Sequence, residues 1–129
     1  MEFFCTTCCK EKRTDPGNLP AIERYLSERI RRVHRESMDK GRRMLIFSGK
    51  FGLLRPEEPI PWYDQKLESD GVGEIVPSLV NQLREYGASK LIFFCRPKNT
   101  EGWQPYHEAL ETACKQAGVE LATRFTAQD

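Results

Sequence analysis

The sequence of 129 residues contains no apolar run long enough to cross a membrane. Its first residues, Met-Glu-Phe-Phe-Cys, carry an acid where a secretory signal has basic residues, and their apolar stretch is too short to be one. These two absences argue against a membrane partner and predict a cytoplasmic chain.

A strong excess of charge is also missing, because the formal net charge is only +1. The distribution of charge is more informative than its total. Residues 1–55 hold 13 Lys and Arg against 7 Asp and Glu, whereas residues 56–129 hold 7 against 12. This asymmetry permits an anionic partner on the N-terminal half without requiring one.

The chain has few groups that typically bind metal ions. It has two histidines, His34 and His107, which are far apart in the sequence and form no His-x-x-x-His pair, and both are predicted to lie on the surface. There is no second Cys-x-x-Cys motif and no phosphate-binding Gly-x-x-x-x-Gly-Lys-Ser/Thr motif. The five cysteines are odd in number, which argues against a closed set of disulfides.

The pattern of apolar residues predicts one α/β domain over residues 1–129. Strands are expected at 2–6, 43–48, 90–95 and, more weakly, 119–126. Helices are expected from Leu19 or Pro20 to Lys40, over 74–86 and over 105–117, with Gly87 and Gly118 ending the last two. Because strands and helices alternate, we expect a three-layer αβα sandwich of Rossmann or flavodoxin-like type, with a mostly parallel four-stranded sheet.

Ligands of such folds bind outside the carboxyl ends of the strands. The predicted topology brings residues 5–10, 48–52 and 95–98 to this edge, so that four of the five cysteines and several cations share one rim. This clustering makes the edge the expected functional surface.

The segment from Ser48 to Leu54, Ser-Gly-Lys-Phe-Gly-Leu-Leu, follows the second strand. Its two glycines permit a tight turn whose backbone N–H groups face an anion, with Lys50 adding a positive charge and Ser48 a hydroxyl. The alternative is a plain turn that leaves Lys50 in solvent.

The motif Cys5-x-x-Cys8-Cys9 leaves three interpretations open. A redox pair normally precedes a helix that lowers a thiol pKa, but a polar, turn-rich stretch follows here. A zinc site would need Cys95 as a fourth ligand. The third interpretation is small, reduced cysteines packed beneath a loop, and Cys114 is expected in the core in every case.

The loop Pro59-Ile60-Pro61-Trp62-Tyr63-Asp64 combines stiff prolines, two aromatic rings and a carboxylate. It suits stacking on a planar ligand, with Asp64 orienting the ligand or acting as a general base. Alternatively, Trp62 and Tyr63 anchor the long loop to the core. The basic residues between Arg29 and Lys40 are interpreted as a solvated helix face or, less favourably, as phosphate contacts.

Two paired motifs resemble the signature of a family of small uncharacterised microbial proteins. The first is Ser48-Gly-Lys-Phe-Gly-Leu-Leu54 with Pro56, and the second is Pro61-Trp-Tyr-Asp64 with Leu67. Members of that family read Ser-Ala-Lys-Tyr-Gly-Leu-Leu and then Pro-Tyr-Asp and a Leu, and they carry a strand ending in Cys with a nearby Lys and a Leu-Tyr-x-Ser stretch. A looser similarity reaches the peroxide stress-response protein family.

The resemblance covers about residues 3–67 and implies a site at the sheet edge, but no reaction or cofactor. The leading hypothesis is a domain that binds a nucleotide, nucleobase or nucleic-acid end, with or without enzymatic activity. The alternatives are a cysteine-based redox or zinc-binding stress-response protein and a non-catalytic accessory domain. The expected catalytic residues are Cys8 and Asp64. The expected ligand-binding residues are Lys10, Tyr25, Ser27, Ser48, Gly49, Lys50, Gly52, Trp62 and Tyr63.

Overall fold

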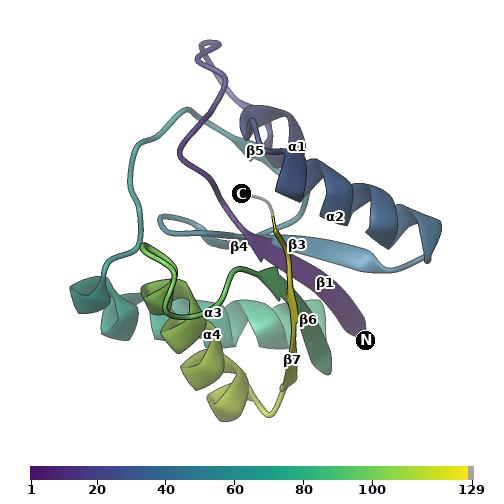
Figure 1. Cartoon of the computed structure of the whole chain (residues 1–129), viewed down its shortest axis with the longest axis vertical. Coiled ribbons are helices and arrows are strands. Elements are labelled where there is room, and N and C mark those ends of the chain that lie inside the picture. The colour runs from purple at the N-terminus through teal and green to yellow at the C-terminus, as the bar shows by residue number, and fades with distance from the viewer. Residues whose placement is uncertain (128–129) are drawn as a thin grey trace.

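The computed structural model describes residues 1–127 and contains a five-stranded sheet with helices packed against it (Figure 1). The strand order is β4-β3-β1-β6-β7. Strands β1, β3, β6 and β7 run parallel, and β4 is antiparallel to β3. Their bounds are Glu2–Thr7 for β1, Arg43–Ser48 for β3, Gly52–Leu54 for β4, Lys90–Cys95 for β6 and Glu120–Phe125 for β7. The predicted α/β class is confirmed.

The helices are α1 (Ala21–Arg24), α2 (Glu28–Asp39), α3 (Val72–Tyr86) and α4 (Gln104–Ala117), with a short 3₁₀ turn, η1, at Ser69–Gly71. Gly87 and Gly118 end α3 and α4 with left-handed backbone, as predicted, because glycine adopts this conformation without steric cost. A separate two-stranded ribbon pairs β2 (Leu19–Pro20) with β5 (Pro59–Ile60).

Alternate side chains of the parallel strands enter two different apolar clusters. Phe3 and Phe47 pack with residues of α3 and α4, whereas Phe4 and Ile46 pack with residues of α1 and α2. The sheet is therefore covered by helices on both faces, with α2 on one side and α3 and α4 on the other (Figure 1). Strands buried on both faces explain the continuously apolar runs in the sequence.

The single helix expected from Leu19 to Lys40 is wrong, because the chain forms α1, a break, and then α2. At the break, Tyr25 is extended and pairs with Lys12 in an isolated antiparallel bridge. Ser27 then caps α2, its hydroxyl accepting a bond from the N–H of Ile30 at 3.2 Å. Leu26 has the helical spacing of four from both Ile22 and Ile30 that predicts an inward-facing residue, but it is 43% exposed. Long-range backbone pairing has overridden the helical pattern at these positions.

The predicted sheet of four strands lacks β4. The chain reverses after Ser48, which pairs with Gly52, so the glycine-containing segment forms a hairpin rather than an open loop. Gly52 has a φ of 75°, and a methyl group in its place would lie 2.4 Å from Oε1 of Gln82. The glycine therefore serves the turn and the contact with α3.

His107 is also misplaced by the sequence analysis, because it is 4% exposed. Its Nε2 lies 2.8 Å from the carbonyl oxygen of Arg96, and its ring centroid lies 5.1 Å from that of Phe93. His107 shares a face of α4 with Leu110 and Cys114, at helical spacings of three and four, and this spacing is the signal for its burial.

Within residues 1–127, no helix combines the length and apolarity needed to cross a bilayer.

Candidate functional site at the carboxyl ends of β1 and β6

A cavity of about 630 Å³ opens beside the carboxyl ends of β1 and β6. Four stretches of chain form its walls: the end of β1 and the loop after it, the first turn of α2, the segment 64–66, and the loop that enters α4. This volume falls in the usual range for small-molecule sites. The lining residues are Thr7, Cys8, Cys9, Lys10, Lys12, Arg29, Asp64, Gln65, Lys66, Glu101, Gly102, Trp103 and Tyr106.

Positive charge exceeds negative charge around this cavity. Its lining includes four cationic side chains and only two carboxylates, those of Asp64 and Glu101. A concave surface lined mainly by one sign of charge concentrates ligands of the opposite sign. The expected residues Cys8, Lys10 and Asp64 all line the cavity, so the structure brings these three together.

Arg29 forms part of the cavity wall from a buried position, being only 3% exposed. Its guanidinium donates hydrogen bonds to the hydroxyl of Thr6 and, at 2.9 Å, to the carbonyl oxygen of Thr7. It also lies 4.9 Å from the ring centroid of Trp103. Its assignment to a solvated basic face is therefore wrong. Arg29 precedes the inward-facing Val33 by one helical turn, and this spacing could have revealed its burial.

Cys8 lies beside Tyr106, with its sulfur 3.6 Å from the phenolic oxygen. The N–H of Leu67 donates to that same oxygen at 3.0 Å, which leaves the phenolic proton able to point toward the sulfur. Burial raises the pKa of Tyr106 above its usual value, so the phenol keeps its proton. In the sequence, the spacing of Tyr106 from Leu110 and Ala113 predicts only that it faces inward from the helix.

The other thiols of this region, Cys9, Cys5 and Cys95, lie in different surroundings from Cys8. Burial raises the pKa of Cys9 to about 11, and its sulfur lies 3.1 Å from the carbonyl oxygen of Glu11. Cys5 and Cys95 are fully buried in the core beside α3 and α4. Within residues 1–127, no three Cys, His, Asp or Glu side chains gather closely enough to hold a metal ion, so the four thiols considered for zinc are not assembled as a site.

Three expected ligand-binding residues form a buried chain of hydroxyls beneath the cavity. The oxygen of Ser48 lies 2.8 Å from that of Tyr63, which in turn contacts the hydroxyl of Tyr25. The N–H groups of Lys50 and Phe51 donate to Ser48 at 3.1 and 3.0 Å. These N–H groups, expected to face an anion, are therefore already engaged.

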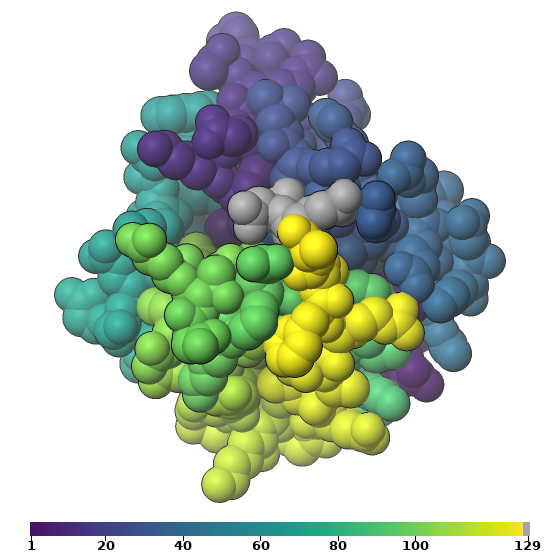
Figure 2. All heavy atoms as spheres, in the orientation of Figure 1, coloured from purple at the N-terminus to yellow at the C-terminus, as the bar shows by residue number. Residues whose placement is uncertain are grey.

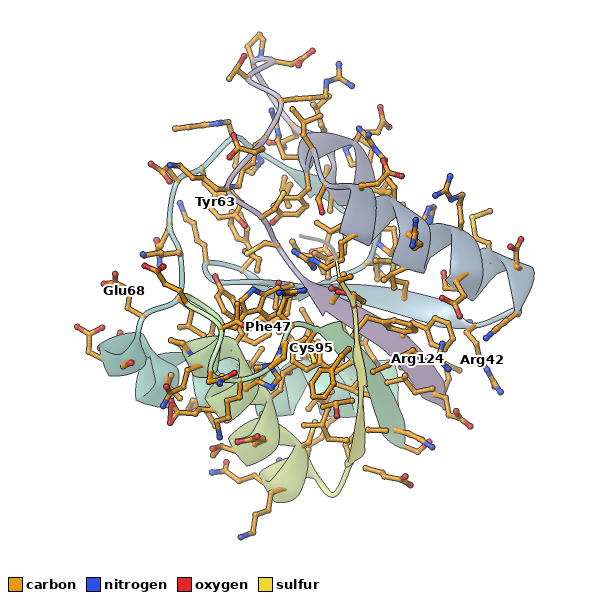
Figure 3. All side chains as sticks on the ribbon, viewed as in Figure 1. Arg42, Phe47, Tyr63, Glu68, Cys95 and Arg124 are labelled. Atoms are coloured by element: carbon orange, nitrogen blue, oxygen red, sulfur yellow. The ribbon has the colours of Figure 1, made fainter. Side chains whose placement is uncertain are left out.

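The ring of Tyr63 supports a cavity residue rather than a ligand. Tyr63 is 4% exposed, and the ammonium of Lys12 lies 4.6 Å from its ring centroid. A cation over an aromatic face is electrostatically favourable. Figure 3 shows Tyr63 near the loops, away from the labelled core residues Phe47 and Cys95. Lys12, which no sequence pattern singles out, thus lines the cavity with its ammonium packed over the ring of Tyr63.

Lys50 and Gly49 belong to a neighbouring hollow of about 330 Å³. Gln65 and Lys66 line both hollows and so form the wall between them. A methyl group on Gly49 would lie 2.7 Å from the backbone nitrogen of Leu67, which shows how closely these two segments of the chain approach each other. Lys50 therefore lies next to the main cavity but not in its lining.

The remaining expected residues lie elsewhere. Trp62 is 52% exposed and lies outside the lining of the main cavity. Ser27 caps α2, as described above. Lys98 pairs with Glu111 at 2.8 Å, on the outer side of α4. The expected convergence of residues 95–98 with the other two strand ends is replaced by residues 101–103, which follow in the same loop.

No family model, curated protein or solved structure matches this chain. The resemblance carried by the sequence motifs stays a prediction.

Proposed function

We propose that this protein binds a small anionic ligand, of the nucleotide class, in the 630 Å³ cavity. The observation that carries the proposal is the set of four cations facing two carboxylates around a hollow of ligand size. Lys10, Lys12 and Lys66 come from two separate segments and would hold phosphate groups from different sides. The apolar wall formed with Tyr106 would receive a base or another planar group.

The position of the cavity supports the same proposal. Strands β3 and β6 lie on opposite sides of β1, so the chain leaves the centre of the sheet in two directions. In doubly wound sheets of the Rossmann and flavodoxin-like type, which we propose as the fold class here, this reversal opens a crevice where nucleotides bind. The cavity lies at the carboxyl end of β1, the central strand, and residues 101–103 of the loop after β6 form part of its wall.

An enzymatic version of the proposal uses the two expected catalytic residues. Cys8 would supply a nucleophile and Asp64 a general base at the wall of the cavity. Tyr106 would keep its phenolic proton and donate a hydrogen bond to the sulfur. Binding without chemistry, as an accessory domain, is the simpler version and requires only the cations.

A thermal-shift titration with inorganic pyrophosphate and with adenine and guanine nucleotides tests the proposal. A ligand at roughly 100 times its dissociation constant stabilises a protein by about 2.7 kcal/mol. We expect a nucleotide to raise the midpoint of unfolding, and Lys10→Ala and Lys12→Ala to abolish most of that rise.

Lys50→Ala is the matched control, because Lys50 is an exposed lysine outside the main cavity. We expect this variant to keep the ligand-induced rise. The proposal fails if no anion stabilises the wild type, or if Lys50→Ala loses as much of the rise as Lys10→Ala does.

A thiol function at Cys8 is the second candidate, supported by its contact with Tyr106. Peroxide would oxidise the thiolate to a sulfenic acid, with the sulfur losing two electrons, the O–O bond breaking and hydroxide leaving. Thiol titration before and after mild peroxide, with Cys8→Ser as the control, tests it. Equal losses of thiol in the two proteins would end this interpretation.

A further inference from the structure

Within the described part of the chain, side chains of a helix cover one edge strand of the sheet, β4, but not the other, β7. At one edge, side chains of α3 cover β4: Oε1 of Gln82 accepts from the N–H of Leu53 at 2.8 Å, and the hydroxyl of Tyr86 donates to the carbonyl oxygen of Leu53 at 3.3 Å. Covering an edge in this way prevents it from pairing with another chain. The β4 edge is therefore closed.

At the other edge, β7 is bare over its length. Its residues are exposed or half-buried, and Phe125 is 64% exposed. Figure 2 shows β7, in yellow, on the surface turned toward the viewer. The strand contains no proline to prevent pairing, and its two charged side chains, Glu120 and Arg124, lie on one face, where Arg124 packs on the ring of Phe94. Among residues 1–127, β6 is the strand that pairs with it.

The hydrogen bonds at the two ends of β7 show which backbone groups point outward. The N–H of Glu120 bonds to Ser89 and that of Thr126 bonds to Cys95, so even-numbered residues direct their N–H groups toward β6. Because strand residues alternate, the N–H and C=O groups of Leu121, Thr123 and Phe125 face away from the sheet. An antiparallel partner strand must therefore match these odd-numbered residues.

We propose that the partner is a second copy of this chain, paired antiparallel through β7 about a twofold axis at Ala122. This register joins Leu121 of each copy to Thr123 of the other through outward backbone groups. It also places Glu120 of each copy opposite Arg124 of the other, in the close, non-hydrogen-bonded position. The two copies together form one continuous sheet with twofold symmetry.

Charge complementarity selects this register and this occupant. Within the chain, Glu120 pairs with Lys90 at 3.4 Å and Arg124 with Glu36 at 2.9 Å. Their side chains are still 69% and 50% exposed, so each can also reach a partner strand and share its charge across the axis. Opposite charges facing one another across strands stabilise pairing, and like charges destabilise it. Moving the axis to Thr123 would keep the backbone bonds but would set Arg124 against Ala122 and lose both ion pairs.

Sedimentation equilibrium of the full chain tests the proposal. We expect the wild type to show a mass twice its 15.0 kDa. Thr123→Pro removes an outward N–H without touching the ladder to β6, so we expect a folded monomer. Thr123→Val keeps that N–H and should stay dimeric. A wild type that is monomeric at every soluble concentration, or a Thr123→Pro variant that still dimerises, would overturn the proposal.

Charge reversal gives an independent measurement should Thr123→Pro fail to fold. Glu120→Arg and Arg124→Glu each place like charges across the axis, so each alone should weaken dimerisation at least tenfold. The double variant restores opposite charges and should recover the dimer. Dimerisation that is indifferent to all three variants contradicts this register.

Discussion

The hydroxyl of Ser48 lies 2.8 Å from that of Tyr63, and the backbone fixes the direction of this hydrogen bond. The oxygen of Ser48 already accepts from the N–H groups of Lys50 and Phe51. With both lone pairs engaged, Ser48 must donate its proton to Tyr63, which then donates to Tyr25. One buried serine thus organises both the β3–β4 turn and the hydroxyl chain that runs through Tyr63, on whose ring Lys12 packs.

Replacing Ser48 with alanine should destabilise the fold. The substitution leaves two backbone N–H groups and the oxygen of Tyr63 without this partner, in a place with little access to water. A buried polar group left unsatisfied costs about 1–3 kcal/mol, so we expect the free energy of unfolding in urea to fall by at least that amount. Ser78→Ala, on the exposed side of α3, is the control and should change it little. Equal effects of the two substitutions would contradict the hydroxyl chain.

Gly49→Ala should loosen the wall between the two hollows. The added methyl group would lie 2.7 Å from the nitrogen of Leu67 and 3.0 Å from the hydroxyl of Tyr106. Such overpacking costs about 1–3 kcal/mol. Gly73→Ala is the control, because a methyl group there meets nothing within 4 Å and the residue lies in α3, where alanine is favoured by about 1 kcal/mol. Urea unfolding should therefore move in opposite directions for the two variants.

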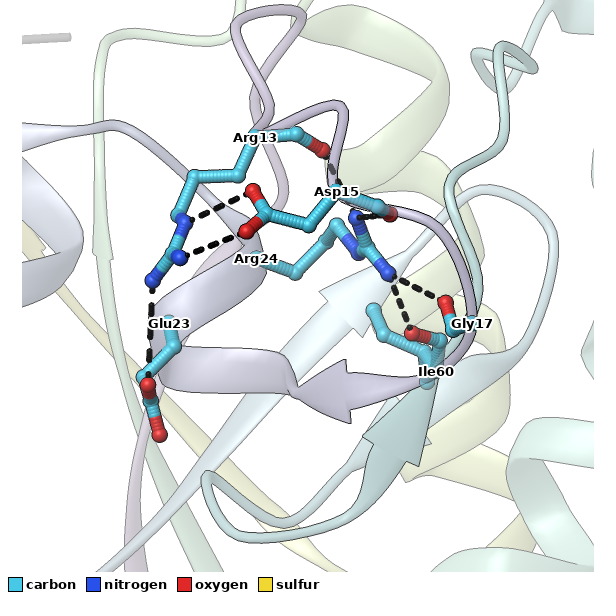
Figure 4. Close-up of polar contacts among 6 residues, drawn as sticks. All are labelled: Arg13, Asp15, Gly17, Glu23, Arg24 and Ile60. Atoms are coloured by element: carbon cyan, nitrogen blue, oxygen red, sulfur yellow. Dashed lines mark hydrogen bonds and ion pairs between the residues drawn. The ribbon is translucent and has the colours of Figure 1, made fainter.

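Arg24 should be essential for the loop before β2. It is fully buried and donates to the carbonyl oxygens of Arg13, Asp15, Gly17 and Ile60, at 2.7 to 3.2 Å (Figure 4). Arg24→Met removes all four bonds, and we expect a loss of about 3 kcal/mol or more of the free energy of unfolding.

Limited proteolysis measures the same effect locally, because residues 13–18 should become cleavable in Arg24→Met. Arg13→Ala is the control. It removes the exposed pair with Asp15, also drawn in Figure 4, and should leave both the stability and the cleavage pattern almost unchanged. A loop that stays resistant in Arg24→Met would contradict the anchoring role.

Raising the pH above about 9 should lower the free energy of unfolding, because buried phenols and a buried thiol resist losing their protons in the folded protein. Burial raises the pKa of Tyr63 and Tyr106 above the ordinary value of 10.0. The unfolded chain releases these protons first as the pH rises, so the stabilisation is complete below about pH 10 and is lost above it. Burial likewise raises the pKa of Cys114 from 9.0 to about 11, which starts the loss near pH 9.

Urea unfolding from pH 8 to pH 11 measures this dependence. Each such group contributes a slope of at most about 1.4 kcal/mol per pH unit. Tyr106→Phe removes one phenol and should make the curve shallower above pH 10. A free energy of unfolding that is flat across this range would show that the phenols are accessible to water.

The sequence was sufficient for the main strands and for the ends of α3 and α4, because local signals determine them. The strands at 43–48 and 90–95 are uniformly apolar, and Gly87 and Gly118 stop the helices before them. Strand β4 has three residues, too short for any alternation to appear. The break at Tyr25 depends on pairing with Lys12, a contact that no local pattern records.

The candidate site was only partly predictable, for a related reason. Strand ends located Cys8 and Lys10, because parallel topology alone carries them to the edge of the sheet. The hairpin after β3 turned Lys50 into the neighbouring hollow, and loop folding brought residues 101–103 to the cavity in place of Lys98. The burial of Arg29 could be inferred only from its helical spacing of four to Val33.

The phenol of Tyr106 bridges the segment that ends at Leu67 and the sulfur of Cys8. The neighbouring residue Lys66 faces the cavity. The proposed ligand would contact Lys66 and so bear on the same stretch of backbone that holds this phenol. In the proposed function, recognition of charge at Lys66 would therefore be coupled, through the backbone N–H of Leu67, to the phenol that lies against the sulfur of Cys8.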